Sequence, residues 1–209
     1  MRTFRKRAPR TLALTGAAAA AALLLAACGD DEPMNGMDHG GTSASSSASA
    51  PSSAAPSASG SFNDADVMFA QMMIPHHQQA LEMAKLADGR AEDADIKKIV
   101  AAVEQAQDPE IQKMKAWLKG WGKPESAGAG HSMAGMMSEQ DMKDLAAVQG
   151  KDFDRKFAEL MIAHHEGAVE MAKEEQKNGR NAEAKTLAGE VVRAQEAEIA
   201  ELRKILDRL

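Results

Sequence analysis

Apolar residues recur with a helical period over four long stretches of the chain, and polar residues fill the positions between them. Spacings of three, four and seven residues bring the apolar side chains to one face of each stretch. The pattern predicts four helices, at roughly 64–87, 92–119, 152–177 and 181–208. Ser138, followed three residues later by Asp141, predicts the start of a short additional helix before Gly150.

The first and third of these stretches are copies of one another. Residues 69–85 recur without a gap as residues 157–173, at an offset of 88 residues. The same offset continues through the helix that follows each copy. The chain therefore carries two repeated helical hairpins, at about 64–119 and 152–208, joined by a Gly- and Met-rich linker at about 120–137.

Composition agrees with an all-α fold. The chain has only five Phe, two Trp and no Tyr, whereas the helix-forming residues Ala, Met, Leu, Glu and Lys are abundant. One hairpin cannot bury its apolar stripe alone, but two hairpins offer each other complementary faces. Each fully buried Leu, Ile or Met would then contribute about 1.5 to 3 kcal/mol. We predict a four-helix bundle over residues 63–209 with pseudo-twofold symmetry between the repeats.

The N-terminal residues 1–27 have the pattern of a bacterial export signal. A positively charged start precedes an apolar run from about Leu12 to Ala27, which is short and Ala-rich for a membrane span. The run ends in Leu25-Ala26-Ala27-Cys28, which resembles a lipobox. We predict that Cys28 becomes a lipid-modified N-terminus that anchors the protein to the outside of the cell membrane. The alternative is an incidental cysteine near an ordinary cleavage site.

Residues 28–62 predict a flexible tether between this anchor and the bundle. Their Ser-, Ala- and Pro-rich composition cannot bury enough apolar area to fold. The tether and the linker each carry a small cluster of Met and His. Apolar Met gains little in a solvated loop, so these residues either occur there by chance or capture a thiophilic metal. The candidates for such auxiliary capture are Met34, Met37, His39, His131, Met133, Met136 and Met137.

Each repeat places adjacent histidines and several methionines on its first helix. The predicted inward face carries Asp66, Phe69, Met73, His76, Ala80 and Met83 in one repeat, and Asp154, Phe157, Met161, His164, Ala168 and Met171 in the other. Thioether sulfur is soft and favours Cu(I), while imidazole also suits Cu(II), so copper is the predicted ion. The candidate ligands are His76, His77, His164, His165, Met73, Met83, Met161 and Met171. The alternative interpretation is that these residues only pack in the core.

The second helix of each repeat has polar residues within its apolar stripe. These are Gln107, Glu110, Gln195 and Glu198. A Glu buried in a helical core needs a cation, a hydrogen-bond partner or water, because an unpaired charge there is costly. We predict that these residues orient the imidazoles or accept their protons. A modest rotation that turns both Glu side chains outward is the alternative.

Other metals and partners fit the sequence less well. A di-iron centre in a helical bundle needs Glu and Glu-x-x-His, but the corresponding positions here read Met73-x-x-His76 and Met161-x-x-His164. Cys28 is the only cysteine, which excludes a zinc site with several cysteine ligands and a disulfide within the chain. The net charge of −6 and the absence of a basic stripe argue against binding of nucleic acid.

A longer motif resembles a known family. It reads Phe153-Asp154-x-x-Phe157, then Met161-Ile-x-His164-His165-x-Gly167-Ala168, then Met171-Ala172, and later Gln195-x-x-Glu198-Ile199. The first repeat carries the same motif except that Gln79 stands at the position of Gly167. The motif resembles the family catalogued as domain of unknown function 305. The resemblance implies a ferritin-like helical bundle that is commonly exported, with some relatives implicated in copper binding or resistance.

Together these patterns predict an extracytoplasmic lipoprotein that binds copper for sequestration, buffering or handover. Its expected partners are the metal ion, the membrane through Cys28, and a metal-handling protein or a second copy of the chain. One alternative is a metal-dependent oxidoreductase, although the sequence shows no nucleophile motif, nucleotide-binding loop or acid and base pair. The other is a structural or partner-binding bundle without metal.

Overall fold

The computed structural model describes residues 60–128 and 133–209. Within these residues it contains helices and no strands, which confirms the predicted all-α four-helix bundle. The elements are α1 (Asp64–Leu86), α2 (Ala94–Gly120), α3 (Glu139–Ala147), α4 (Gly150–Asn178) and α5 (Ala182–Arg208). The predicted export signal, most of the predicted tether and His131 lie outside the described residues.

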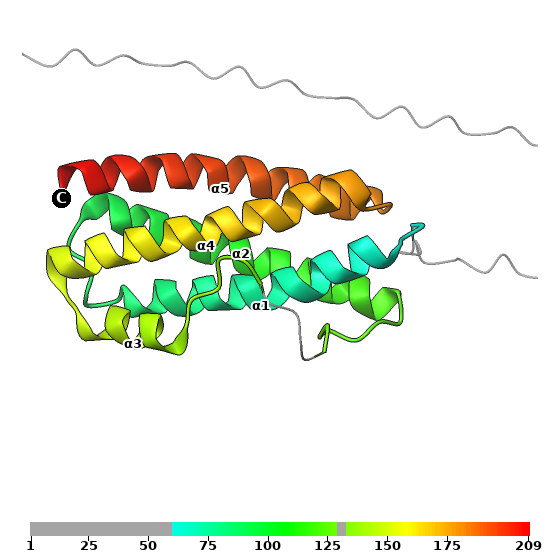
Figure 1. Ribbon diagram of the computed structural model, residues 1–209, viewed down its shortest axis with the longest axis horizontal. Helices are drawn as coiled ribbons and strands as arrows, with labels where there is room; N and C mark the ends of the chain where they lie inside the picture. The colour runs from blue at the N-terminus through cyan, green and yellow to red at the C-terminus, as the bar shows by residue number, and fades with distance from the viewer. Residues whose placement is uncertain (1–59, 129–132) are drawn as a thin grey trace, which may run out of the picture. The chain divides into compact units, whose positions relative to one another are not determined.

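Four long helices lie side by side, and the short helix α3 lies against one end of α1 and α4 (Figure 1). Helices α1 and α2 form one hairpin, and α4 and α5 form the other. The hairpins meet through α1 against α4 and α2 against α5. The two repeats therefore build one bundle, with the motif-bearing helices α1 and α4 in mutual contact.

Local sequence signals explain where the helices begin. Asn63 and Asp66 form a capping box at the start of α1, and Ser138 and Asp141 form another at the start of α3. Asp93 and Asn181 cap α2 and α5 by accepting bonds from backbone N–H groups of the first turn. Both prolines that fall within helices, Pro75 in α1 and Pro109 in α2, are spanned by continuous helix. No helix in residues 60–128 and 133–209 is apolar enough over its length to cross a bilayer.

The core consists of two clusters of buried side chains along the bundle. One cluster includes Met73 of α1 and Ala168 of α4, and the other includes Ala80 of α1 and Met161 of α4. His76 lies between Met73 and Ala80 in the sequence, and His164 lies between Met161 and Ala168. The imidazoles therefore occupy the junction of the two clusters, at the middle of the bundle.

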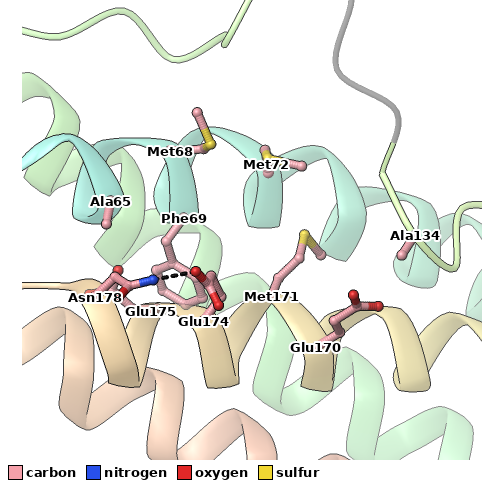
Figure 2. Close-up of a pocket in the computed structure, with 10 residues that line it drawn as sticks. All are labelled: Ala65, Met68, Phe69, Met72, Ala134, Glu170, Met171, Glu174, Glu175 and Asn178. Carbon is pink, nitrogen blue, oxygen red and sulfur yellow. Dashed lines mark hydrogen bonds between the residues drawn. The ribbon is translucent and has the colours of Figure 1, made fainter.

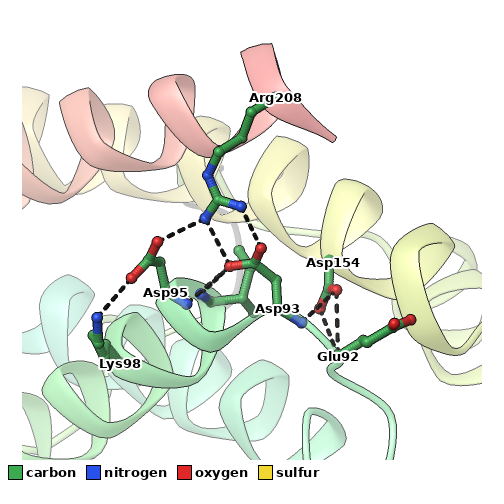
Figure 3. Close-up of polar contacts among 7 residues, drawn as sticks. Glu92, Asp93, Asp95, Lys98, Asp154 and Arg208 are labelled. Atoms are coloured by element: carbon green, nitrogen blue, oxygen red, sulfur yellow. Dashed lines mark hydrogen bonds and ion pairs between the residues drawn. The ribbon is translucent and has the colours of Figure 1, made fainter. Parts of the chain in front are cut away.

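Two buried aspartates connect each repeat to the other. Asp154 of α4 accepts hydrogen bonds from the backbone N–H groups of Glu92, at 3.1 Å, and Asp93, at 2.8 Å (Figure 3). Its counterpart Asp66 of α1 accepts from Arg180, at 3.0 Å, and Asn181, at 2.8 Å. Each carboxylate thus satisfies backbone donors just before the second helix of the opposite repeat.

The C-terminal end of α5 also bonds the first repeat. The Arg208 guanidinium donates to the carboxylates of Asp93 and Asp95, with Nη2 at 2.8 Å from Asp93 Oδ1 and at 2.7 Å from Asp95 Oδ2 (Figure 3). Asp95 in turn accepts from Lys98 Nζ at 2.7 Å. This exposed network and the buried Asp154 both bond residues at the start of α2, so they connect the two repeats at the same end of the bundle.

Candidate metal centre

The four histidines of the repeated motif are all buried where α1 faces α4. His76, His77 and His165 have no exposed surface, and His164 is 1% exposed. The rings of His76 and His164 lie with their centroids 3.8 Å apart and their planes at 40°. The pseudo-twofold relation between the repeats therefore brings one histidine of each pair into direct contact.

The other histidine of each pair bonds the second helix of its own hairpin. His77 Nε2 lies 2.7 Å from Glu110 Oε2, and His165 Nε2 lies 2.7 Å from Glu198 Oε2. The Glu110 and Glu198 side chains are 19% and 17% exposed, so they face the histidines and do not turn outward. Both repeats thus build the same imidazole and carboxylate pair.

The other two predicted polar residues of the second helices, Gln107 and Gln195, are also buried, three residues before Glu110 and Glu198. Gln107 and Gln195 are 3% and 4% exposed, respectively. Their Oε1 atoms have no hydrogen-bond partner among the described residues. Each repeat therefore leaves one carbonyl oxygen acceptor unsatisfied in the bundle interior.

His76 has its oxygen partner in the linker between the repeats. His76 Nε2 lies 3.2 Å from the carbonyl oxygen of Ala134. Gly167 permits this position, because a Cβ atom there would lie 2.1 Å from the Ala134 oxygen. Gly135 follows with a φ of +77°, a conformation that favours glycine. The linker backbone thus passes directly over α4 beside the imidazoles.

Gln79 of α1 holds the next part of the same linker. Its Nε2 donates to the Met137 carbonyl oxygen at 2.9 Å, and its Oε1 accepts from the Met137 N–H at 2.7 Å. The sequence motif differed between the repeats at this position, with Gln79 in one and Gly167 in the other. That difference was the available signal, and sequence reasoning did not connect it to the linker.

The hydrogen bonds define which ring nitrogens are free. The Nδ1 atoms of His76, His77, His164 and His165 have no hydrogen-bond partner within the part of the chain that the structure describes, and neither does His164 Nε2. An Nε2–H that donates to an oxygen leaves a lone pair on Nδ1 in a neutral ring. For His76, His77 and His165 this is the tautomer that the contacts favour.

The environment keeps the central pair uncharged. Burial, together with the neighbouring His77, lowers the pKa of His76 to about 3. Burial and the neighbouring His76 also lower the pKa of His164 well below its ordinary value. Both rings are therefore neutral at physiological pH, which is the form that binds metals.

The predicted sulfur ligands fall into two groups. Met73, Met83 and Met161 are fully buried, whereas Met171 is half-buried, although its counterpart Met83 has no exposed surface. Met73 and Met161 lie one helical turn before His76 and His164. The auxiliary residues Met133, Met136 and Met137 are half-buried in the linker, while Met34, Met37, His39 and His131 lie outside the described residues.

Imidazoles and carboxylates alone do not complete a metal site in this arrangement. Within residues 60–128 and 133–209, no three side chains of His, Cys, Asp or Glu gather at spacing suited to a metal ion. The chemistry available is therefore a pair of neutral imidazoles, with the buried Met73 and Met161 one helical turn away on the same helices. Such a soft, nitrogen- and sulfur-rich environment suits copper better than a hard, oxygen-preferring ion.

Fold and site together define a class of duplicated four-helix bundles with two histidine rings in contact at the centre. Comparison of the sequence with protein families identifies which one. The sequence profile of the family described as domain of unknown function, DUF305, matches residues 66–206. The chain belongs to the DUF305 family. No curated protein matches the chain.

Solved structures of similar proteins share the fold. A candidate secreted DUF305 protein from Streptomyces coelicolor is 32% identical, with 69% of this chain and 93% of that chain covered and a TM-score of 0.66. A DUF305 fragment from Deinococcus radiodurans is also 32% identical, with 70% and 98% covered and a TM-score of 0.64.

A third similar protein, CopM, has been solved with metal ions. Its Cu(I)-bound form is 34% identical to this chain, with 68% of this chain and 96% of that chain covered and a TM-score of 0.61. CopM is also known in Cu(II)-bound, Ag-bound and apo forms.

Proposed function

We propose that this protein binds copper outside the cytoplasm, for sequestration, buffering or handover, at the histidine cluster in the middle of its bundle. His76, His77, His164 and His165 are the nitrogen ligands of this proposal. The fully buried Met73, Met83 and Met161 supply sulfur ligands or a soft surrounding that excludes water, whereas Met171, which was predicted with them, is only half-buried. Cys28, when lipid-modified, anchors the protein to the membrane.

One observation carries the proposal. All four imidazoles are buried, and their Nδ1 atoms have no hydrogen-bond partner in residues 60–128 and 133–209. A buried polar atom without a partner costs about 1 to 3 kcal/mol, so native proteins rarely keep several in one place. A metal ion that accepts these lone pairs removes the cost.

The carboxylates support the same proposal. Histidines that bind metals commonly donate their second N–H to a carboxylate, which orients the ring and makes it more basic. Glu110 and Glu198 stand in that position, each 2.7 Å from the Nε2 of His77 or His165. The Ala134 carbonyl oxygen has the same relation to His76.

The relatives support the identity of the ion and the compartment. CopM, 34% identical over 68% of this chain, has been solved with Cu(I), Cu(II) and Ag. The Streptomyces coelicolor relative is described as a candidate secreted protein. Both agree with the predicted export signal at residues 1–27 and with the soft character of the buried site.

An anaerobic titration tests the proposal. We expect Cu(I) at about 100 times its Kd to stabilise the native protein by about 2.7 kcal/mol, because the ion binds only the folded state. The double variant His76→Ala/His164→Ala should lose the buried site and most of this stabilisation. Thermal unfolding and competition with a chromophoric Cu(I) chelator measure the two effects.

A matched control separates ligand loss from helix damage. Gln78 and Glu166 are exposed, occupy equivalent positions in the repeats, and follow the histidine pairs directly. The variant Gln78→Ala/Glu166→Ala should bind Cu(I) as the wild type does. Equal Cu(I) binding by the histidine variant and the wild type would show that the histidine cluster is not the site.

The two alternatives from the sequence predict different results in related assays. A metal-dependent oxidoreductase would consume oxygen when loaded with copper or iron and given a reductant. A structural or partner-binding bundle would contain no metal after purification without a His tag and would show no stabilisation by Cu(I). Release of a Cys28→Ser variant from the membrane fraction tests the anchor separately.

A further inference from the structure

A groove of about 400 Å³ lies between α1 and α4 and brings three thioethers together at the surface (Figure 2). Met68 and Met72 come from successive turns of α1, and Met171 comes from α4. Met68 is 45% exposed, and no other large apolar side chain in the described residues is exposed. Packing does not explain this placement, because an exposed methionine gains little from the hydrophobic effect.

Three glutamates line the groove together with Ala65, Phe69, Ala134 and Asn178. Glu170, Glu174 and Glu175 of α4 line the groove, and no Lys or Arg is among its described lining residues. Glu170 and Glu174 are exposed at the rim, while Glu175 is buried. The exposed carboxylates of Glu170 and Glu174 attract cations, and focusing of the field in a groove raises the local concentration of these cations.

The methionines of α1 that line this groove have no counterparts in the second repeat. At the offset of 88 residues, the positions of Met68 and Met72 are occupied in the second repeat by Lys156 and Leu160. Helix α3 covers that end of the α1 and α4 contact, where Lys156 pairs with Asp144 at 3.6 Å. The set of three thioethers is therefore not repeated at the equivalent positions of the other half.

We propose that this groove is a second, surface site for a soft monovalent cation, Cu(I) or Ag(I), bound by the thioethers of Met68, Met72 and Met171. Thioether sulfur selects such ions over hard cations. The rim carboxylates of Glu170 and Glu174 balance the charge. The proposal deepens the proposed function and rests on it for the choice of copper as the natural ion.

The groove adjoins the buried histidines through the linker. Ala134 lines the groove, and its carbonyl oxygen is the partner of His76 Nε2 at 3.2 Å. Met171 is also one of the half-buried residues at this boundary. An ion in the groove is therefore one layer of backbone away from the imidazoles, at the point where the linker crosses the bundle.

Titration of the full chain with Ag(I), which has no competing redox chemistry, tests the surface site. The chain is labelled with ¹³C at the methionine ε-methyl groups and followed by NMR. We expect the methyl signals of Met68, Met72 and Met171 to shift together, and excess Mg²⁺ to leave them in place. The triple variant Met68→Leu/Met72→Leu/Met171→Leu should bind one Ag(I) fewer than the wild type in chelator competition.

A check of the fold and a matched control variant make the result specific. Met→Leu conserves volume, so the triple variant should keep its fold, which circular dichroism checks. If the triple variant unfolds, Met68→Leu alone carries the test and should weaken Ag(I) binding at least tenfold. Met114→Leu/Met142→Leu, which replaces a core residue of α2 and a half-buried residue of α3, should bind Ag(I) as the wild type does.

The outcomes separate this site from the buried one. In His76→Ala/His164→Ala the three methyl signals should still shift, which supports the groove whatever happens at the histidines. Full stoichiometry in the triple variant, or methyl signals that do not move, would overturn the groove. Loss of one ion in the triple variant with unchanged binding in the histidine variant would support the groove and overturn the buried site.

Discussion

Glu175 is a buried acid that stays protonated in the folded protein. Its side chain is 2% exposed and lies beside Asp66. Burial, and then the neighbouring Asp66, raise the pKa of Glu175 to about 8. Burial opposes ionisation of Asp66 as well, but the neighbouring Glu175 and hydrogen bonds from three backbone N–H groups lower the pKa of Asp66. At neutral pH the pair therefore carries one proton, on Glu175, and Asp66 is ionised.

This proton makes stability depend on pH. Between pH 4.5, the ordinary pKa of a glutamic acid, and about pH 8, the folded state binds a proton that the unfolded state has released. Glu175 should therefore lower the free energy of unfolding as pH rises through this window, by up to about 1.4 kcal/mol per pH unit. The buried His76 and His164, whose pKa values are lowered, act in the opposite direction below pH 6.5. The contribution of Glu175 is therefore the difference between the pH dependence of the wild type and that of Glu175→Gln. Urea unfolding of both proteins at pH 5.5 and pH 7.5 measures it, with the exposed neighbour change Glu174→Gln as the control.

At the level of single residues, the sequence predicted the buried polar positions that recur in both repeats. The inward histidines and Asp66 and Asp154 recur at matching positions, so their burial followed from the pattern. Glu175 corresponds to Ala87 in the first repeat, and nothing in the sequence connected it to Asp66. Pairing across helices depends on packing that a single repeat does not encode.

Among the elements, the helices were predictable and the linker was not. The observed α1, α2, α4 and α5 lie within two residues of their predicted ends, because helical periodicity and capping residues specify them locally. Residues 133–137 have no such period. Their path over α4 depends on Gln79 of α1, Gly135 of the linker and Gly167 of α4. These residues are far apart in sequence, so no local pattern predicts the path.

The crossing of the linker over α4 predicts a strong effect of one methyl group. In Gly167→Ala the new Cβ would meet the Ala134 carbonyl oxygen at 2.1 Å, so the linker must move off the helix. We expect a loss of about 1 to 3 kcal/mol of stability, as for other overpacked sites, together with loss of the His76 contact. Urea unfolding measures the first effect.

Gly189 on α5 is the matched comparison for this change. A Cβ there would meet only the flexible end of the Gln176 side chain, at 3.0 Å. Because Ala is a better helix former than Gly, Gly189→Ala should be neutral or stabilise by up to about 1 kcal/mol. A Gly167→Ala protein as stable as Gly189→Ala would mean that the linker is not held as described.

At the scale of the whole molecule, the two hairpins are held together by core packing and by exchanged aspartates. The repeat predicted the bundle and the meeting of the motif-bearing helices, since each hairpin needs the other to bury its stripe. It did not predict that Asp66 and Asp154 would bond across the repeats. Both aspartates were predicted only to face inward, and Asp66 also forms the capping box of its own helix.

Removing one exchanged aspartate should weaken the whole bundle. Asp154→Ala leaves the N–H groups of Glu92 and Asp93 without their carboxylate, and Asp154 itself has no exposed surface. We expect a loss of about 3 kcal/mol, because bonds to a charged acceptor are strong and buried donors without partners are costly. Thermal and urea unfolding should agree on the loss. Glu159→Ala, at an exposed position of α4, should change stability by less than about 0.5 kcal/mol.

Gln79 and Gly167 occupy equivalent positions but contact the linker differently, so the two halves of the chain are not equivalent. A homodimer built from two first halves would present glutamine on both sides of the axis, and one built from two second halves would present bare backbone on both. Neither arrangement provides the single amide clamp and the single gap that seat residues 134–137. The two halves are therefore not interchangeable, and a symmetric dimer of either half would need a different path for residues 134–137.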